Sequence, residues 1–307
     1  MGTLEAGTRD PADEVRAGTR WLLWAFAVLT LLAVNQLFVL ADAADWLWAW
    51  PIQTEMTAAF IGAAYAAGFA LSVLALRQDR WSRIRIPLIT VTVFTTLTAV
   101  ATLVHAHRLN MMSGGPVAEA AAWVWLVVYL VIPIACAVVV LRQERRWVRR
   151  DRVLRPMPGW LSGILAVEGA VMAAAGSVLF VGGLRVHHHE AAVTMFWPWP
   201  ITPLSGMVIG AWLIAFAVAA VLVIREGDLA TLFVSGVTYT VFGVVELVAL
   251  IWHWPQVYAG SPWLWAYAAL LVAIVGTGGY GWWAARRPLP GDRGHEAEAR
   301  PTTSSHP

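Results

Sequence analysis

Glu246 and His253 are a carboxylate and an imidazole seven residues apart within an apolar stretch of the sequence. Seven residues correspond to two turns of a helix, so both side chains are expected on one helical face. A carboxylate inside a membrane helix is costly unless it is paired or faces a polar cavity. We therefore interpret Glu246 as the leading candidate for ligand recognition or proton coupling, with His253 beside it.

Further imidazole and carboxylate groups are expected at the same level of the molecule as His253. Two histidines held on helices, His105 and His253, could be the axial ligands of a haem. A wider set could hold zinc, copper or iron, for which imidazole and carboxylate are suitable ligands. This wider set consists of His105, His107, His187, His188, His189, His253 and Glu190, and Glu55 is a further carboxylate within reach.

Three interpretations of these residues stay open: a metal or haem site, a proton relay in a coupled transporter, and a structural role at a membrane interface. The spacings contain no His-x-x-x-His or His-Glu-x-x-His pattern, and Cys136 is the single cysteine, so no metal motif decides the matter. The sequence also has no Gly-x-x-x-x-Gly-Lys loop, no Gly-x-Ser-x-Gly turn and no soluble domain, which argues against an enzyme.

The elements that must position these side chains are membrane-spanning helices. Hydrophobic residues make up 59% of the chain and charged residues 13%, which is too little charge to cover a soluble surface of this size. A hydrocarbon core of roughly 30 Å requires about 20 apolar residues per helix. The sequence therefore predicts an all-α integral membrane protein with eight transmembrane helices. The apolar runs lie at about 21–41, 51–76, 86–105, 119–141, 160–184, 200–224, 229–252 and 263–284.

The basic residues predict the orientation of these helices. All 21 are arginines, and 19 of them lie in the termini or in the connections on one side of the membrane. Arg108 and Arg185 are the two on the other side. Because positively charged connections stay in the cytoplasm, we expect a multi-pass protein of the bacterial plasma membrane with both termini cytoplasmic. We interpret the arginine cluster between the fourth and fifth helices as a linker that sets the topology, and we expect the lipid bilayer, and no nucleic acid, as a partner of the protein.

The two halves of the chain resemble each other. Residues 60–105 align without a gap with residues 208–253, and 14 of these 46 positions are identical. Composition alone would make roughly a tenth of the aligned positions identical. The last aligned pair is His105 with His253, which places both histidines at the same depth. Four helices per half return the chain to the side on which it started, so we expect two parallel four-helix repeats.

The repeat sets the expected domain organisation. Residues 1–20 are polar and mixed in charge, so they are expected to be a cytoplasmic segment and not a cleaved signal peptide. The later segments are a first four-helix repeat at 21–141, an Arg-rich cytoplasmic linker at 142–156, a second four-helix repeat at 157–284 and a disordered cytoplasmic tail at 285–307.

Tryptophan is concentrated at one boundary of the predicted membrane region. The phrase Trp48-Ala49-Trp50-Pro51-Ile52 recurs as Trp197-Pro198-Trp199-Pro200-Ile201, and each copy is expected to begin a helix, the second and the sixth. Tryptophan side chains at this level usually anchor a protein among the lipid headgroups, and we expect that role here. An aromatic vestibule that stacks on a ligand is the alternative.

A further carboxylate, Glu168, also lies within an apolar run. We expect it to bond to a serine or threonine on a neighbouring helix, because such bonds satisfy polar groups in lipid. Tyr65 and Tyr239 are additional candidate partners for the buried carboxylates.

The stretch Trp199-Pro200-Ile201-Thr202-Pro203-Leu204-Ser205, followed by Gly210-Ala211-Trp212, resembles a phrase that opens a transmembrane helix in a family of uncharacterised bacterial multi-pass membrane proteins. The resemblance covers the sixth helix and its approach, and it implies no activity because that family has none assigned. In the first half the similarity to this phrase ends after Ile52, and Glu55 lies where Leu204 or Ser205 would align.

Together these features favour a permease-like or channel-like protein that handles a small solute near the outer face, between the halves. Glu246 would be its coupling or recognition carboxylate, and His253 and His105 would flank it. The alternatives are a membrane protein that binds haem or a divalent metal, and a non-catalytic assembly subunit whose partners are other membrane subunits.

Overall fold

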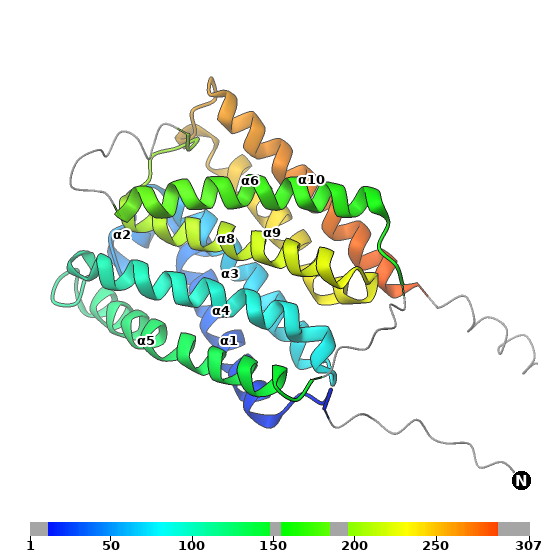
Figure 1. The fold of residues 1–307 in the computed structure, drawn as a ribbon. Coiled ribbons are helices and arrows are strands. Elements are labelled where there is room, and N and C mark those ends of the chain that lie inside the picture. The colour runs from blue at the N-terminus through cyan, green and yellow to red at the C-terminus, as the bar shows by residue number, and fades with distance from the viewer. Residues whose placement is uncertain (1–11, 148–154, 185–195, 288–307) are drawn as a thin grey trace, which may run out of the picture.

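Eight long apolar helices make up most of the protein, as the computed structural model shows for residues 12–147, 155–184 and 196–287 (Figure 1). These described residues contain no β-strand, which confirms the predicted all-α membrane fold. The helices are α1 (Ala17–Val34, extended by a π-helical turn, Asn35–Val39), α3 (Glu55–Leu76), α4 (Trp81–Val104), α5 (Pro116–Glu144), α6 (Gly159–Leu184), α8 (Pro203–Glu226), α9 (Leu232–Trp252) and α10 (Pro262–Arg286).

Proline and short polar residues set where several of these helices begin. Pro203 and Pro262 occupy the first turn, where the missing amide donor costs nothing. Thr202 and Ser261 precede them, and each side chain accepts a hydrogen bond from a backbone amide of the first turn. Between the long helices lie a short helix, α2 (Ala44–Leu47), and 3₁₀ turns at Ala41–Ala43, Ala106–Arg108, Leu229–Thr231 and Trp254–Gln256.

Four helices form the centre of the molecule and four surround them. In the centre, α3 packs against α9 and α4 packs against α8. Each central helix also carries one outer helix: α1 lies on α3, α5 on α4, α6 on α8, and α10 on α9. Consecutive central helices, by contrast, hardly touch, so the contacts that close the bundle join segments far apart in the sequence.

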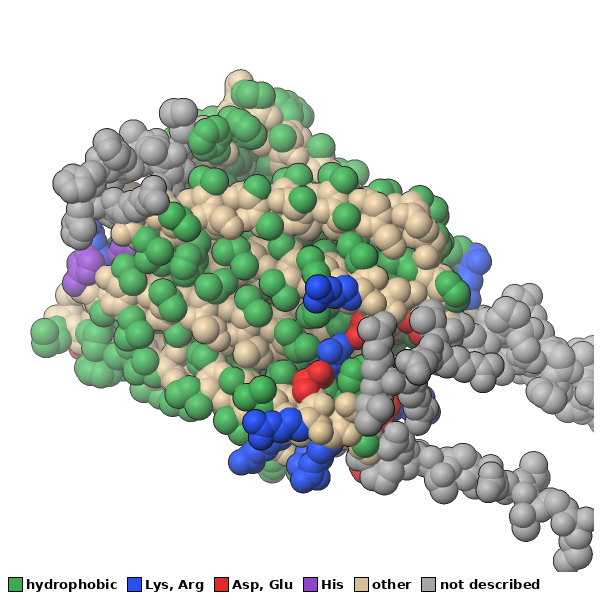
Figure 2. All heavy atoms as spheres, viewed as in Figure 1, with side chains coloured by type: hydrophobic (Ala, Val, Ile, Leu, Met, Phe, Trp, Pro, Cys, Tyr) green, Lys and Arg blue, Asp and Glu red, His purple; other side chains and the backbone are tan. Residues whose placement is uncertain are grey.

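Charge and aromatic side chains mark the two ends of the bundle. We call one the arginine end, since it carries Arg77, Arg80, Arg83, Arg85, Arg225 and Arg286 at helix termini. The opposite end, which we call the tryptophan end, carries Trp46, Trp48, Trp50, Trp197, Trp199 and Trp254. Hydrophobic side chains cover the lateral surface between them, while the acidic and basic ones gather at the arginine end (Figure 2). This distribution is what a membrane-spanning protein requires.

The two tryptophan phrases differ from expectation in both position and role. They do not begin helices, because α3 starts at Glu55 and α8 starts at Pro203, so each phrase forms the non-helical approach to its helix. Trp48, Trp50, Trp197 and Trp199 are buried in the hydrophobic core and do not face lipid. Their expected role as lipid anchors is therefore wrong, whereas Trp46, Trp123, Trp252, Trp254, Trp263 and Trp265 are exposed as anchors should be.

Matching positions in the two halves make matching contacts. Trp50 Nε1 donates a hydrogen bond to Ser205 Oγ, and Trp199 Nε1 donates one to Thr57 Oγ1, each over 3.1 Å. Likewise the amide of Asn110 donates to Ala49, and the amide of Tyr258 donates to Pro198, each over 2.9 Å. Two isolated β-bridges, Glu14 with Arg80 and Pro156 with Asp228, form a third such pair.

Candidate functional site

Glu246 is fully buried in α9, near the tryptophan end. Its Oε1 accepts a hydrogen bond from the hydroxyl of Tyr267 in α10, and its Oε2 has no protein partner. The aligned position in the first half, Thr98, is also buried and also has an unpartnered side-chain oxygen. The expectation of a costly, membrane-embedded carboxylate at residue 246 thus matches its environment, and its hydrogen-bond partner is a phenol.

Aromatic rings surround the partner of this carboxylate. The ring of Tyr267 lies 5.5 Å from Trp199, 6.0 Å from Trp197 and 6.5 Å from Phe60, measured between centroids. The indole nitrogen of Trp197 is buried without a hydrogen-bond partner. A polar pair is therefore enclosed by rings, and this enclosure excludes the solvent that would otherwise stabilise an ionised Glu246.

The histidines expected beside Glu246 contact other groups. His253, directly after α9, has its Nδ1 3.3 Å from Glu55 Oε2 at the start of α3. His105, directly after α4, has its Nε2 3.1 Å from the carbonyl oxygen of Gly183 near the end of α6. Burial lowers the pKa of His105, the hydrogen bond to Gly183 opposes this shift, and the neighbouring His107 and Arg108 add to it. The structure thus places Glu246, His253 and His105 in three separate sets of contacts.

The metal and haem hypothesis gains no support from the part of the chain that the structure describes. Within it, no three His, Cys, Asp or Glu side chains gather closely enough to hold a metal ion. His107 is exposed, and its ring lies 6.0 Å from that of His105. Four of the proposed ligands, His187, His188, His189 and Glu190, lie outside the described residues.

Glu168 of α6 forms a second buried carboxylate cluster, together with residues of α9 and α10. Its side chain accepts hydrogen bonds from Thr277 of α10 and from Tyr239 of α9, each over 3.2 Å. This confirms the expected bond to a threonine on a neighbouring helix and the expected role of Tyr239. Tyr65 instead bonds to the hydroxyl of Tyr129, so it is not a carboxylate partner.

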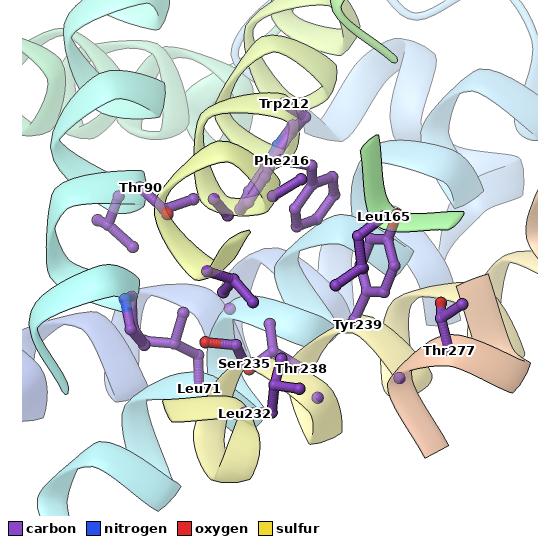
Figure 3. A pocket seen from close by; sticks show the side chains of 18 residues that line it. Leu71, Thr90, Leu165, Trp212, Phe216, Leu232, Ser235, Thr238, Tyr239 and Thr277 are labelled. Carbon is purple, nitrogen blue, oxygen red and sulfur yellow. The ribbon is translucent and has the colours of Figure 1, made fainter. Parts of the chain in front are cut away.

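A cavity of about 70 Å³ lies between the central helices, towards the arginine end. Thr90 of α4 and Thr277 of α10 lie on opposite sides of it (Figure 3). Phe216, Leu165 and Tyr239 converge on the side near Thr277 (Figure 3). Its other lining residues include Gly68, Leu71, Pro87, Val91, Trp212, Ala219, Ala220, Val223, Leu232, Ser235 and Thr238.

The walls of this cavity are apolar, although several of its residues carry hydroxyls. Thr90, Ser235 and Thr238 each donate to the carbonyl four residues earlier on their own helix. The remaining two hydroxyls, of Tyr239 and Thr277, donate to Glu168. The cavity therefore suits an apolar body, and its polar contacts with a ligand would concentrate on the side where Glu168 lies.

Arg85 connects the two halves at the arginine end of the cavity. Its guanidinium pairs with Glu144 of α5, at 2.6 Å, and with Glu226 of α8. Trp81 donates to the same Glu144 oxygen, and Arg85 also lies over the ring of Trp147 at 4.6 Å. Pro87 and Val223 line the cavity and are close in sequence to Arg85 and Glu226. The cluster therefore closes the bundle between the cavity and the arginine end.

No protein-family model, curated protein or solved structure matches this chain. The site is therefore defined by its own geometry: an apolar cavity between helices of both halves, a carboxylate behind its wall and a second carboxylate nearer the tryptophan end.

Sequence reasoning did not identify the cavity or the cluster around Arg85. Arg85 was assigned to the positive connections, although it directly precedes an apolar run, and that position was the available signal of a partly buried arginine. The cavity had no comparable signal, since most of its residues are alanine, leucine, valine and threonine, which are common on any buried helix face.

Proposed function

We propose that this integral membrane protein is a permease-like carrier that moves a small solute through the central cavity. The observation that carries the proposal is the position of the cavity, which helices α3 and α4 enclose together with α8 and α9. Binding sites of secondary transporters lie at such interfaces between repeats, at membrane depth. Glu168 and Glu246 supply the buried ionisable groups that coupling requires.

The proposal includes two parallel four-helix repeats, at 21–141 and 157–284, related by an axis along the membrane normal. The paired hydrogen bonds of Trp50 and Trp199 support this relation, as do the paired contacts α3 with α9 and α8 with α4. In this arrangement the arginine end, with both termini, faces the cytoplasm of a bacterial cell, according to the positive-inside rule. Membership of the uncharacterised multi-pass family belongs to the same proposal.

Glu246 is the coupling carboxylate near the outer face in this proposal. Its free oxygen and its single phenolic partner support the assignment, because nothing in its described surroundings compensates a permanent negative charge. His253 and His105 flank it at the same end of the bundle, where His253 contacts Glu55 and His105 contacts the carbonyl oxygen of Gly183.

The proposal is tested by uptake into proteoliposomes. Three poorly permeant solutes share one ring and differ in charge: benzyltrimethylammonium, benzenesulfonate and phenylalanine. We expect at least one of them to accumulate in response to a pH gradient. Glu246→Gln should slow this uptake about tenfold or more, as loss of an essential ionisable group does. Asp45→Asn, a change of an exposed carboxylate at the tryptophan end, should leave it unchanged.

A second pair of variants tests the cavity itself. Ala219→Phe places a ring in the cavity and should abolish uptake, whereas Val221→Phe on the exposed side of α8 should preserve it. Size-exclusion chromatography and thermal unfolding report whether both variants are folded. Equal uptake by the two variants, or uptake of none of the three solutes by the unmodified protein, would overturn the proposed function.

A further inference from the structure

Glu168 and the apolar cavity form one composite site. Tyr239 and Thr277 both line the cavity and both donate to the Glu168 carboxylate, so one layer of hydroxyls separates the carboxylate from the cavity. Leu165, one helical turn before Glu168 on α6, lines the cavity directly. A ligand in the cavity is therefore one side-chain rearrangement away from a buried acid.

The two hydroxyls that cover Glu168 have other acceptors within reach. Thr277 Oγ1 also donates to Ala273 of its own helix, over 2.9 Å. The Tyr239 hydroxyl lies 3.7 Å from Met172 Sδ, a weak acceptor. Because both can keep a partner, Glu168 can exchange these neutral donors for a charged group without leaving a hydroxyl unsatisfied.

The described surroundings of Glu168 hold no cation that would balance an ionised carboxylate. The titratable group that faces it is Tyr239 of α9, and α10 contributes Thr277. From α8, Ala217 and Ala220 approach Gly169 next to it. A carboxylate buried in this way is stable when a proton or a cation neutralises it, and costly otherwise.

Aromatic rings line the cavity next to these hydroxyls. Trp212 and Phe216 of α8 line it, with ring centroids 5.7 Å apart, and Phe216 also lies 5.9 Å from Tyr239. The faces of such rings attract organic cations, and most strongly where water is excluded. Aromatic rings close to a buried carboxylate are the complement of a small cation with an apolar body.

We propose that Glu168 binds either a proton or a small organic cation, so that the carrier exchanges one for the other. The proposal rests on the proposed transport function and names its solute class and its driving ion. In the exchange, the O–H bond of the Glu168 carboxylic acid breaks and its proton leaves to solvent. The entering cation then pairs with the carboxylate. One positive charge replaces another, so the buried site stays neutral overall.

The decisive test is proton release on binding, measured on detergent-purified protein in weakly buffered solution with a pH indicator dye. The probe is benzyltrimethylammonium, whose permanent charge carries no exchangeable proton, so any released proton comes from the protein. We expect about one proton released per cation bound. Competition for a single site makes the apparent affinity rise about tenfold per pH unit in the range where Glu168 is protonated. Benzyl alcohol, the neutral control, should release none.

Variants identify the side chain that releases the proton. Glu168→Gln should abolish proton release and weaken cation binding about tenfold or more, because it removes the ion pair. Tyr239→Phe, a smaller change at the same site, should keep proton release and alter the affinity. Asp45→Asn, at an exposed carboxylate of the tryptophan end, is the control and should change neither proton release nor affinity. Proton release that persists in folded Glu168→Gln protein, or cation binding without release in the unmodified protein, would refute the exchange.

This test and the transport test fail independently. Uptake of benzenesulfonate or phenylalanine alone would retain the carrier and reject the cation. Proton release without uptake of any solute would retain the exchange site and reject the carrier.

Discussion

Trp199 Nε1 donates a hydrogen bond to Thr57 Oγ1 over 3.1 Å, which joins the approach to α8 to the first turn of α3. The hydrogen bond from Trp50 to Ser205 is its counterpart, since it joins the approach to α3 to the first turn of α8. All four side chains are buried, so each bond is made away from water. These two bonds connect the halves at the tryptophan end, as the Arg85 cluster connects them at the arginine end.

We expect Trp199→Phe and Thr57→Ala each to lower the free energy of unfolding by about 1 kcal/mol. Thr57→Ala leaves the buried indole N–H of Trp199 without this acceptor, and Trp199→Phe removes that N–H and its hydrogen bond. A double-mutant cycle should give a coupling of about 0.5–1.5 kcal/mol between them. Thermal unfolding in detergent measures these values. Trp46→Phe, at an exposed tryptophan, is the control and should change little. Additive effects in the cycle would show that the bond is not formed.

Two aligned glycines should be sensitive to one added methyl group. A Cβ at Gly210 would lie 2.6 Å from the Gly176 carbonyl oxygen, and one at Gly62 would lie 2.7 Å from the Phe38 amide nitrogen. Backbone atoms cannot move aside cheaply, so Gly210→Ala and Gly62→Ala should each destabilise the protein by about 1–3 kcal/mol. Gly276→Ala, where nothing lies within 4 Å, should be neutral or slightly stabilising. Unchanged melting temperatures in all three variants would contradict the close packing.

Arg85→Gln should open the arginine end of the cavity, because it removes the ion pairs with Glu144 and Glu226. The measurement is the rate of thiol labelling at Ser235→Cys, which lines the cavity, in a background where the single native cysteine is changed to alanine. We expect labelling to become several-fold faster. Arg83→Gln, at an exposed neighbouring arginine, is the control. Equal rates in the two variants would mean that the cluster does not limit access.

The stability of the protein should fall in mild acid because of His105. Burial lowers the pKa of this imidazole, so the folded protein takes up its proton less readily than the unfolded chain does. Stability is therefore fully present above the usual histidine pKa of about 6.5 and is lost as the pH falls through and below that value. Thermal unfolding between about pH 7.5 and about pH 5 should show a smaller loss in His105→Gln than in the unmodified protein. Replacing the exposed His107 should reduce the loss only slightly, because its charge is a smaller cause of the lowered pKa of His105 than burial is.

The number and approximate positions of the membrane helices could be predicted because length and apolarity alone decide them. The sequence could not reveal that α3 pairs with α9 and α4 with α8. These helices are apolar on most faces, so no stripe of polar residues indicates which side meets a partner. The two buried tryptophan phrases were misplaced for a related reason, since a core tryptophan and an interfacial one look alike in sequence.

The candidate site could be predicted in part. The type of partner that Glu168 finds follows from the cost of burying a carboxylate, but its place beside a cavity depends on which helices meet there. The spacing of Glu246 and His253 predicts that the two side chains share a helical face. Their side chains nevertheless contact α10 and α3 respectively, because the helix ends between them and His253 lies beyond its last turn.

The crossed pairing of the central helices has a consequence for how the cell makes this protein. Helices α3 and α4 are synthesised and inserted well before α8 and α9, with which they form most of their central contacts. Until then their inner faces meet lipid. Residues such as Ala58, Ala63 and Ala67 are fully buried later but tolerate that interval, because small apolar side chains are as compatible with lipid as with protein. We therefore expect the first half to enter the membrane without a finished core, and the central contacts to form when the second half is inserted.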